Sequence, residues 1–487
     1  MAATLSSALP GVVSPRCVNA PRGWLDRELH SPGGLTVPAS RRVPFDLNPP
    51  LQGYLDRTYA ACGQTLGVHL AAWNSTQVVV EALRVGWYRG GTARLVWRSA
   101  PVLVRRQHTL PTQARVTQDN QWPTTLTLRP DASWAPGLYL IRFRAVDHTA
   151  PDTYQPLYVL TSGAHAAYLA IGSDLTQLAY GKAGGASLYQ GPGGTVEEAR
   201  KKRAYVASTH RALQGPGTYQ LLSMDVPLAV FLAHHRITAD WTSDMSLDAD
   251  PSQVDGYATI VIPGHSEYWT RRNYDTLTHA VDGGTNLAVL GANEIYWQTR
   301  LRRDARGSVA SMAVYRSAAT DPMTSPQDKT VQWRQAPLRR DPAALTGLGM
   351  AGVGIVGDGT VVSTPSWLFR GTGLQVGAVL KGVYGYEGDG PDDPHAPANE
   401  QILLRSQARD TVGHHVVLAT GYHSTAGGAG VFDAGTTEWL CSVVDLCQLS
   451  GSRDRDVRSD LDRITVNLLS AFARPRAGVH YPSTPTS

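Results

Sequence analysis

The sequence predicts an α/β plus all-β protein, in which an N-terminal antiparallel β-sandwich is followed by an α/β domain with a mostly parallel sheet. Glycine (48 residues) and proline (31) are frequent, and only 17% of the residues are charged, which favours strands and loops over a helical bundle. Short apolar runs separated by turns come first, and strands alternating with helices follow. At 487 residues, the chain is long enough for several domains.

Changes in this pattern predict the domain boundaries. Residues 1–45, rich in Pro, Ser and Arg, are expected to form an N-terminal arm. The β-sandwich is assigned to residues 46–162 and the α/β catalytic domain to residues 163–475, with a β-rich insertion at about 325–380. Residues 476–487 are expected to be a disordered tail.

Three stretches predict the strands of the sandwich. "STQVVVEALRVGWY" (75–88) is rich in valine and aromatic residues, and Gly90-Gly91 suits a hairpin turn into the next strand. "TTLTLRP" (124–130) alternates apolar and polar residues. "DASWAPGLYLIRFRAVD" (131–147) carries a turn at Pro136-Gly137 before a strong strand. Strands at this spacing are typical of a small antiparallel sandwich.

The α/β domain is predicted from a strand–helix–strand succession. "YATIVIPG" (257–264) predicts a buried strand, "RRNYDTLTHAVDGG" (271–284) a helix that ends at glycine, and "TNLAVLGANE" (285–294) the next strand. Neighbouring parallel strands end at the same edge of a sheet, so the polar stretches His265–Trp269 and Asn293–Trp297 are expected to converge on one crevice.

Ser266 resembles the nucleophile of a G-x-S-x-G elbow, but the motif requires glycine two residues later and this chain has Tyr268. A turn serine is the better interpretation. The remaining residues are rich in oxygen: Tyr268 and Tyr296 follow the two strands, and Glu387 lies in "GYEGDG". Taken singly, each residue has an ordinary structural explanation, and spacing alone does not select this set. Together, two phenolates and a carboxylate would neutralise three positive charges, and such hard donors suit ferric iron better than zinc.

Seven stretches follow one another in an order found in a known family. They are "GWYRGGTARLV" (86–96), "GGASLY" (184–189), "PGHSEYWT" (263–270), "GANEIYWQ" (291–298), "YRSAATDPMT" (315–324), "GYEGD" (385–389) and "GVFDAGTTEWL" (430–440). In this order they resemble the N,N-dimethylformamidase large (beta) subunit-like family, over roughly residues 75–475.

The resemblance implies a glutamine-amidotransferase-like α/β domain behind the sandwich, and a mononuclear iron, as Fe(III). Carried onto this chain, the metal ligands it implies are Tyr268, Tyr296 and Glu387. The resemblance also makes three residues beside the ligands catalytic or acid/base candidates, namely His265, Glu267 and Asn293.

This sequence departs from the family in two respects. The family's large chain is longer and works with a separate small subunit. This chain is shorter, and no feature of its sequence indicates a small partner. A family stretch of the type T-x-x-Y-N is "TQLAYGKAGG" (176–185) here, with Lys182 near the expected polar position.

Composition limits the partners. The net charge is +4, and "RKKR" (200–203) is the longest basic run, so no nucleic acid is expected. No membrane partner is expected either, because no stretch approaches the ~20 apolar residues of a span. The four cysteines predict buried free thiols, although Cys441 and Cys447 could pair if the chain were exported. With an N-terminus unlike a secretory signal, the sequence predicts a cytoplasmic protein.

The function predicted is a metal-dependent hydrolase that cleaves an amide C–N bond of a small molecule, as dimethylformamidase does. Two alternatives stay open: an iron-dependent natural-product tailoring enzyme (a lyase, cyclase or oxidative enzyme) using the same site, and a non-catalytic binding protein whose sandwich recognises a glycan or a protein. The need for a small subunit and the formation of a homo-oligomer also stay open.

Overall fold

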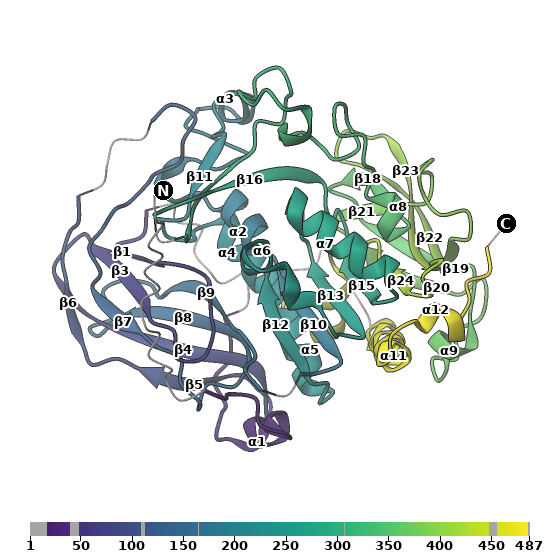
Figure 1. The fold of residues 1–487 in the computed structure, drawn as a ribbon, viewed down its shortest axis with the longest axis horizontal. Helices are drawn as coiled ribbons and strands as arrows, with labels where there is room; N and C mark the ends of the chain where they lie inside the picture. The colour runs from purple at the N-terminus through teal and green to yellow at the C-terminus, as the bar shows by residue number, and fades with distance from the viewer. Residues whose placement is uncertain are drawn as a thin grey trace, which may run out of the picture.

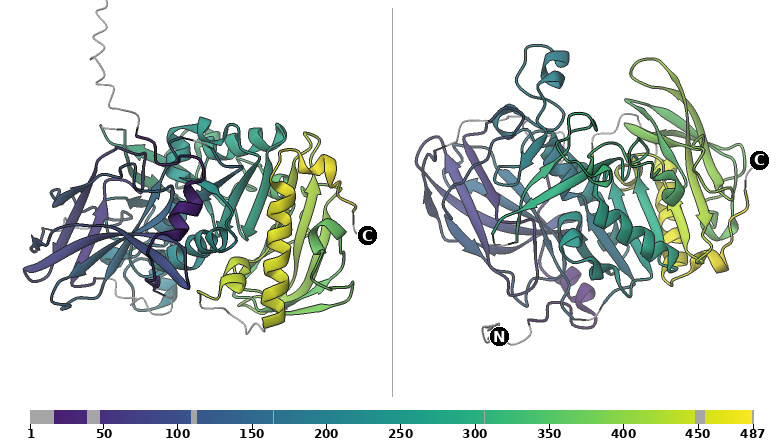
Figure 2. Two further views of the ribbon diagram at one scale, coloured as in Figure 1. Left: turned by 90° about the horizontal axis from the view of Figure 1, so that it is seen from below. Right: turned by 45° about the horizontal axis from the view of Figure 1, so that its top comes forward.

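The computed structural model describes residues 17–38, 48–108, 113–163, 165–305, 307–447 and 455–485. A β-rich N-terminal part, a central part with helices on a parallel sheet, and a β-rich C-terminal part follow one another along the chain (Figure 1). Seen from two further directions, the N-terminal sheets lie at one end of the molecule and the C-terminal antiparallel strands at the other (Figure 2).

Two sheets form the N-terminal part. One has the strand order β1-β3-β7, and the other has the order β2-β9-β8-β4-β5, with β6 paired to β4. Their pairings are antiparallel except between β2 and β9. Leu70 of one sheet and Ile141 and Phe143 of the other belong to one apolar core, so the two sheets pack face to face. The strands are β1 (Leu51–Leu55), β2 (Tyr59–Ala60), β3 (Leu66–Ala72), β4 (Thr76–Tyr88), β5 (Gly91–Arg98), β6 (Val102–Val104), β7 (Leu126–Leu128), β8 (Gly137–Ala145) and β9 (Thr153–Val159).

The central sheet has nine strands in the described part of the chain, in the order β12-β10-β13-β15-β24-β23-β22-β19-β20. The pairings from β12 to β24 are parallel, and those from β24 to β20 are antiparallel. The sheet is therefore mixed, whereas a mostly parallel sheet was expected, because the strands after residue 356 extend it by antiparallel neighbours. The strands are β10 (Tyr168–Gly172), β12 (Ala239–Ser243), β13 (Thr259–Gly264), β15 (Asn286–Gly291), β19 (Gly357–Val361), β20 (Val379–Tyr384), β22 (Gln401–Arg409), β23 (His415–Ser424) and β24 (Gly430–Asp433).

Helices cover both faces of the parallel strands. Ile260 and Ile262 of β13 face a core that includes residues of α6 and α7, while Val261 between them faces the core of α5, α10 and α11. Such strands are apolar on both faces, as expected for a parallel sheet with helices on each side. The helices are α5 (Val226–His234), α6 (Asp244–Ala249), α7 (Arg271–Asp282), α10 (Trp439–Val444) and α11 (Arg455–Phe472).

Two smaller sheets and several short helices complete the description. One sheet has the order β11-β17-β16-β14, and the other pairs β18 with β21. Their strands are β11 (Val206–Ser208), β14 (Tyr268–Thr270), β16 (Trp297–Arg303), β17 (Val309–Ala313), β18 (Gly349–Val353) and β21 (Glu387–Gly390). The remaining helices are α1 (Trp24–His30), α2 (Asp174–Tyr180), α3 (Val196–Lys201), α4 (Pro216–Gln220), α8 (Ala343–Thr346), α9 (Ser366–Phe369) and α12 (Ala477–His480), with 3₁₀ turns at Ala183–Gly185, Pro251–Val254 and Pro326–Asp328 and a π-helical turn at Leu221–Asp225.

Helices α2 and α6 begin against each other. The carboxylate of Asp174, the first residue of α2, accepts a hydrogen bond from the backbone N–H of Met245 in α6 (3.2 Å). The carboxylate of Asp244, the first residue of α6, accepts one from the N–H of Leu175 in α2 (3.1 Å). Each helix thus satisfies an otherwise unpaired N-terminal donor of the other.

The cysteines differ from the prediction. Cys17 is bonded to Cys62, and Cys441 is bonded to Cys447, so none of the described cysteines is a free thiol. The sequence could not show the first pair, since 45 positions separate its members and the fold brings their Cα atoms within 5.5 Å. Disulfides are typical of oxidising compartments, so a cytoplasmic location remains a prediction with this observation against it.

The two ends of the chain are more ordered than expected. Near the N-terminus, Glu28 of α1 is buried and accepts hydrogen bonds from the Tyr88 hydroxyl (2.8 Å) and from Arg94 Nη2 (2.7 Å). Near the C-terminus, where a disordered tail was predicted, α12 forms and the ring of Tyr481 stacks on Trp367 at 4.8 Å. These aromatic contacts explain the order. Residues 1–16, 39–47 and 486–487 of the predicted arm and tail lie outside the described residues.

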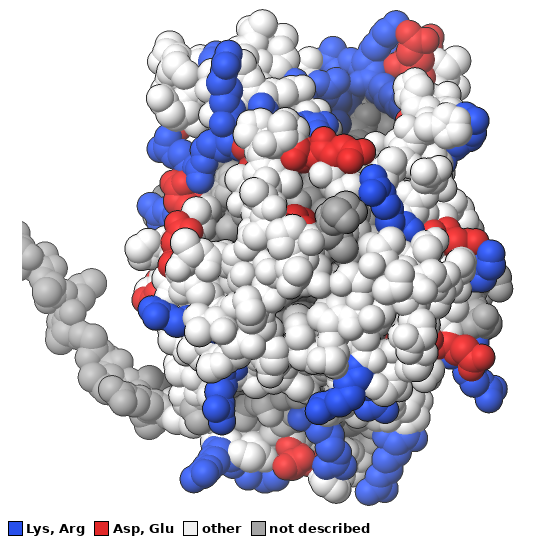
Figure 3. Space-filling model, turned by 90° about the vertical axis from the view of Figure 1, so that its right-hand side faces the viewer, with Lys and Arg blue, Asp and Glu red and all other residues white. Residues whose placement is uncertain are grey.

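The distribution of charged side chains on the surface and the length and polarity of the helices are relevant to the partners that the protein could bind. On the face drawn in Figure 3, basic side chains are scattered at the rims among acidic ones, and the middle of the face is uncharged. Within the described ranges, no helix is both long enough and apolar enough to cross a membrane.

Candidate active site

The site lies where β13 and β15 end. These strands are parallel neighbours in register, with Gly264 opposite Gly291, so the residues that follow them meet at one edge of the sheet. His265 and Asn293 stand just beyond these ends, and β21 brings Glu387 to the same place. The convergence expected from the sequence is therefore present for His265 and Asn293, and Glu387 joins them from a strand that the sequence did not place there.

His265 is the centre of the cluster and is almost completely buried. Its Nδ1 lies 3.1 Å from the carbonyl oxygen of Ala292, which requires the proton on Nδ1. Its Nε2 lies 3.5 Å from Glu267 Oε2 and 3.8 Å from Glu387 Oε2. Burial alone would lower the pKa of His265, but the two carboxylates outweigh burial and raise it to about 10.

Glu267 is held by several donors. Trp297 Nε1 donates to Oε1 (3.0 Å), and the Tyr189 hydroxyl donates a short hydrogen bond to Oε2. The backbone N–H of Glu267 donates to Thr176 Oγ1 of α2 (2.9 Å). Burial acts to raise the pKa of Glu267, yet the hydrogen bond with His265 and its charge lower it overall, so this residue is a carboxylate.

Asn293 connects Glu387 to the strand ends. Its Nδ2 donates to Glu387 Oε2 (2.7 Å), and its backbone N–H donates to both oxygens of Asp389 (3.0 Å each). Its φ of 56° is left-handed, a conformation that asparagine tolerates better than most residues. Its Oδ1 is buried without a hydrogen-bond partner, so an acceptor remains free at the site. Burial raises the pKa of Glu387.

Two further tyrosines belong to the cluster. The Tyr180 hydroxyl, at the end of α2, lies 3.4 Å from His265 Nε2, and its ring centroid is 4.2 Å from that of Tyr189. Burial raises the pKa of both hydroxyls well above the usual value. Sequence reasoning did not select them as functional residues, although both lie in stretches that resemble the family. No spacing rule connects them to Glu267, about 80 residues later.

The two tyrosines predicted as metal ligands each contact an arginine. Tyr268 is buried, and its hydroxyl accepts a short hydrogen bond from Arg316 Nη2. Tyr296 is partly exposed, and its hydroxyl lies 3.4 Å from Arg334 Nη2. The Arg316 guanidinium also lies 4.2 Å from the ring centroid of Tyr189, and sequence reasoning missed this residue as well.

The donor chemistry of the site can be compared with the needs of a hard cation. The oxygens of Tyr180, Tyr189 and Glu267 lie around His265 Nε2, joined by contacts of 3.5 Å or less. The hydroxyls of Tyr268 and Tyr296 instead adjoin guanidinium groups, whose positive charge opposes a neighbouring cation. The residues present offer the oxygen donors that a hard metal ion prefers, and positively charged groups adjoin both sets, His265 and Arg316 the first and Arg316 and Arg334 the second.

Comparison with known proteins gives one family. A family model described as N,N-dimethylformamidase beta subunit-like, C-terminal, matches residues 79–450, more than half of the chain. No curated protein matches the sequence. A solved structure described as "Structure of PhoD" is 8% identical, with 90% of this chain and 100% of that chain covered and a TM-score of 0.21. A likeness of that degree carries no argument.

Proposed function

Because the chain belongs to the N,N-dimethylformamidase beta subunit-like, C-terminal family, we propose that it is a hydrolase cleaving the C–N bond of a small-molecule amide. The observation that carries the proposal within the site is His265 Nε2, which is enclosed between the carboxylates of Glu267 and Glu387 where two parallel strands end. Amide hydrolysis needs a group that gives a proton to the departing amine, and a histidine whose pKa is raised to about 10 carries that proton at neutral pH.

Each residue of the cluster has a role in this proposal. The Ala292 carbonyl engages Nδ1 of His265, so that Nε2 is the atom that gives its proton to the leaving nitrogen. Glu267 orients the imidazole and stabilises its protonated form. Asn293 holds Glu387 through Nδ2, and its free Oδ1 can accept a hydrogen bond from a substrate N–H or a water molecule. The burial of these groups limits the access of bulk water.

We further propose that a mononuclear ferric ion belongs to this site. When bound, it would polarise the amide carbonyl and lower the pKa of a water molecule. The family resemblance suggests Tyr268, Tyr296 and Glu387 as its ligands. The contacts favour Tyr180, Tyr189 and Glu267, because those oxygens lie close together.

Metal analysis of four matched proteins distinguishes the two sets of ligands. We would measure iron by mass spectrometry, and the visible phenolate-to-iron absorption, in wild type, Tyr189→Phe, Tyr268→Phe and Tyr296→Phe. Loss of iron and of the band in Tyr189→Phe alone supports Tyr180, Tyr189 and Glu267 as the ligands. Loss in Tyr268→Phe and Tyr296→Phe supports the ligands that the family resemblance suggests. Wild-type protein that stays free of iron after reconstitution would overturn the proposal of an iron site.

The reaction is tested separately with a panel of small formamides and acetamides, by measuring the amine released with and without oxygen. We expect release that does not depend on oxygen, and a loss of at least about 100-fold in kcat for His265→Gln, the typical contribution of a positioned proton-transfer group. Turnover that requires oxygen would contradict hydrolysis and favour an oxidative tailoring reaction.

A further inference from the structure

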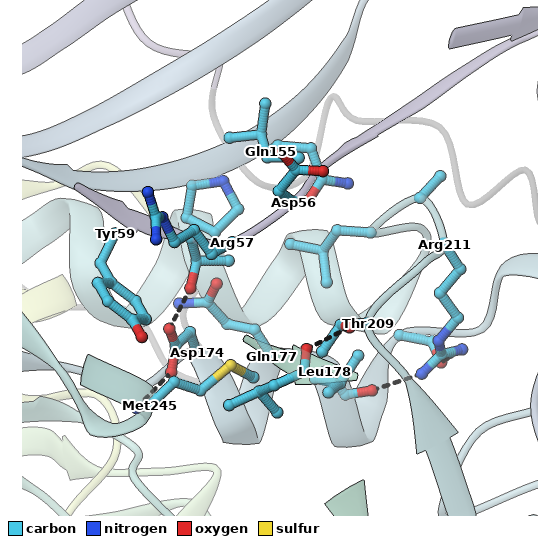
Figure 4. Close-up of a pocket in the computed structure, with 17 residues that line it drawn as sticks. Asp56, Arg57, Tyr59, Gln155, Asp174, Gln177, Leu178, Thr209, Arg211 and Met245 are labelled. Carbon is cyan, nitrogen blue, oxygen red and sulfur yellow. Dashed lines mark hydrogen bonds between the residues drawn. The ribbon is translucent and has the colours of Figure 1, made fainter. Parts of the chain in front are cut away.

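A second cavity lies between the N-terminal sheets and α2, outside the cluster around His265. Arg57 and Tyr59 stand on one side of it, Thr209 and Arg211 on the other, and Met245 lies below (Figure 4). Apolar groups make up much of the wall, and they include Leu55, Pro156, Leu178, Leu213 and Val309. None of the residues assigned to the active site lines this cavity.

Helix α2 separates the cavity from the active site. Asp174, Gln177 and Leu178 line the cavity, at the i, i+3 and i+4 positions of one face. Thr176 and Tyr180, four positions apart, contact the active-site residues instead. The two spaces therefore share one helical wall and use different faces of it.

Two buried polar atoms among the residues of the cavity wall lack partners. Gln177 is 1% exposed, and its Nε2 donates to the Tyr158 hydroxyl and to Asp225 Oδ2 (3.0 Å each). These bonds fix the orientation of the amide and leave Oε1 as an acceptor without a hydrogen bond. Across the cavity, Arg57 Nε is a buried donor without a partner. Neither atom has a hydrogen-bond partner within the described protein, so both can be satisfied by an occupant of the cavity.

Arg211 and Asp174, two of the charged groups of the wall, are already engaged within the protein. Arg211 donates to the carbonyl oxygens of Gly181 (2.7 Å) and Leu178 (2.6 Å). Asp174 accepts from Thr58 and from the backbone of Met245. A ligand need not carry a charge to satisfy what remains.

The size of the cavity limits its occupant. Its volume is about 40 Å³, and a single water molecule needs about 10–15 Å³ on the same measure, so about three water-sized groups fit. An occupant with an apolar body, one donor for Gln177 Oε1 and one acceptor for Arg57 Nε would match the wall.

We propose that this cavity is a second binding site, for a small neutral secondary or primary amide of about four heavy atoms. The N–H of such an amide donates to Gln177 Oε1, its carbonyl accepts from Arg57 Nε, and its alkyl group contacts the apolar wall. A tertiary amide has no N–H and leaves Gln177 Oε1 unsatisfied. The site therefore selects by hydrogen-bond donors among molecules of nearly equal size.

The Met245 methyl group provides a local probe, because the side chain lines the cavity and the chain has only six methionines. We would label the methionine methyl groups of the full-length protein with ¹³C, assign Met245 by Met245→Leu, and titrate with N-methylformamide and with N,N-dimethylformamide. We expect a saturable shift of the Met245 signal, with N-methylformamide binding about fivefold or more tighter, the effect of one net hydrogen bond.

Two cavity variants and one active-site variant decide where the added amide binds. Gln177→Leu removes the acceptor and should abolish the preference for N-methylformamide, while Ala212→Leu fills the cavity and should abolish the shift itself. Glu267→Gln should leave the titration unchanged, whether or not the protein hydrolyses amides. An absent Met245 shift, equal affinity for both amides, or a shift abolished only by Glu267→Gln would overturn the proposal. Circular dichroism of each variant checks that the fold is retained, and either cavity variant suffices for the test.

Discussion

Asn293 combines a strained backbone with a functional side chain. Its left-handed φ and its bond from Nδ2 to Glu387 can be separated by substitution, because glycine adopts a positive φ without cost and alanine does not. We predict that Asn293→Gly and Asn293→Ala lose similar activity, about 10-fold or more, since both remove a hydrogen bond to a carboxylate. The alanine variant should be less stable than the glycine variant by about 1 kcal/mol of unfolding free energy, because only alanine is strained at this φ.

The rate of amine release measures the effect on activity, and denaturant unfolding measures the effect on stability, each independently of the other. Equal stability of the two Asn293 variants would contradict the role given to the backbone. Full activity in the glycine variant would contradict the role given to the side chain.

At the scale of single residues, the sequence predicts part of the site. His265, Glu267 and Asn293 lie together because the ends of the parallel strands β13 and β15 converge, whereas Glu387 comes from β21, outside that pair. Tyr189 joins them from a distant loop, and no local pattern indicates such a contact. The sequence cannot reveal contacts that only the tertiary fold creates, such as the one between Arg316 and Tyr268.

Among the elements, α2 depends on a single buried side chain. Arg211 is almost completely buried, and its described hydrogen bonds go to backbone carbonyls around the end of α2, including those of Leu178 and Gly181. Without a carboxylate partner, burial lowers the pKa of Arg211 to about 9. The same residue bonds the carbonyl of Ala186, which precedes Tyr189, and so it holds both tyrosine-bearing segments.

We predict that Arg211→Met lowers the free energy of unfolding by about 2–4 kcal/mol, because several buried carbonyls lose their donor. Arg211→Lys should restore little of it, since an ammonium group cannot span carbonyls that a planar guanidinium reaches together. The control is Arg200→Met, an exposed arginine on α3, with an expected change within about 0.5 kcal/mol. Denaturant midpoints measure the stability of all three variants. An unchanged midpoint for Arg211→Met would refute the role assigned to Arg211 in holding α2.

The regular elements of the sandwich region and of the α/β region follow closely from sequence patterns. The predicted stretch 257–264 contains β13, 271–284 contains α7, and 285–294 contains β15, because each strand is a short continuous apolar run and the helix period is visible in α7. The pairing of β24 with β23 is not visible in this way. Strand direction depends on connections across the sheet, so the mixed sheet could not be predicted from local patterns.

For the whole molecule, the two disulfides close loops of very different length. The Cys17–Cys62 bond spans 45 positions and the Cys441–Cys447 bond spans 6. On a chain-entropy basis, we predict that replacing the first pair by serine costs about 4 kcal/mol of stability and replacing the second about 2 kcal/mol. Unfolding of the two double variants measures the difference.

Thiol titration of the denatured wild-type protein, without reductant, gives the direct control for that prediction. We expect no reactive thiol if all four cysteines are bonded as the structure has them. Four alkylated cysteines, in protein alkylated at the moment of cell lysis, would contradict the pairing and would restore a reducing compartment as the place where the chain works.

The mutual capping of α2 and α6 also determines how the molecule opens. Neither Asp174 nor Asp244 can leave its place without exposing a donor at the start of the other helix, so fraying at one helix end spreads to its partner. The two helices consequently form one cooperative unit, whose backbone amides exchange with solvent in a single event. Because α2 carries Tyr180 and also walls the second cavity, the local unfolding of this unit disrupts both sites at once.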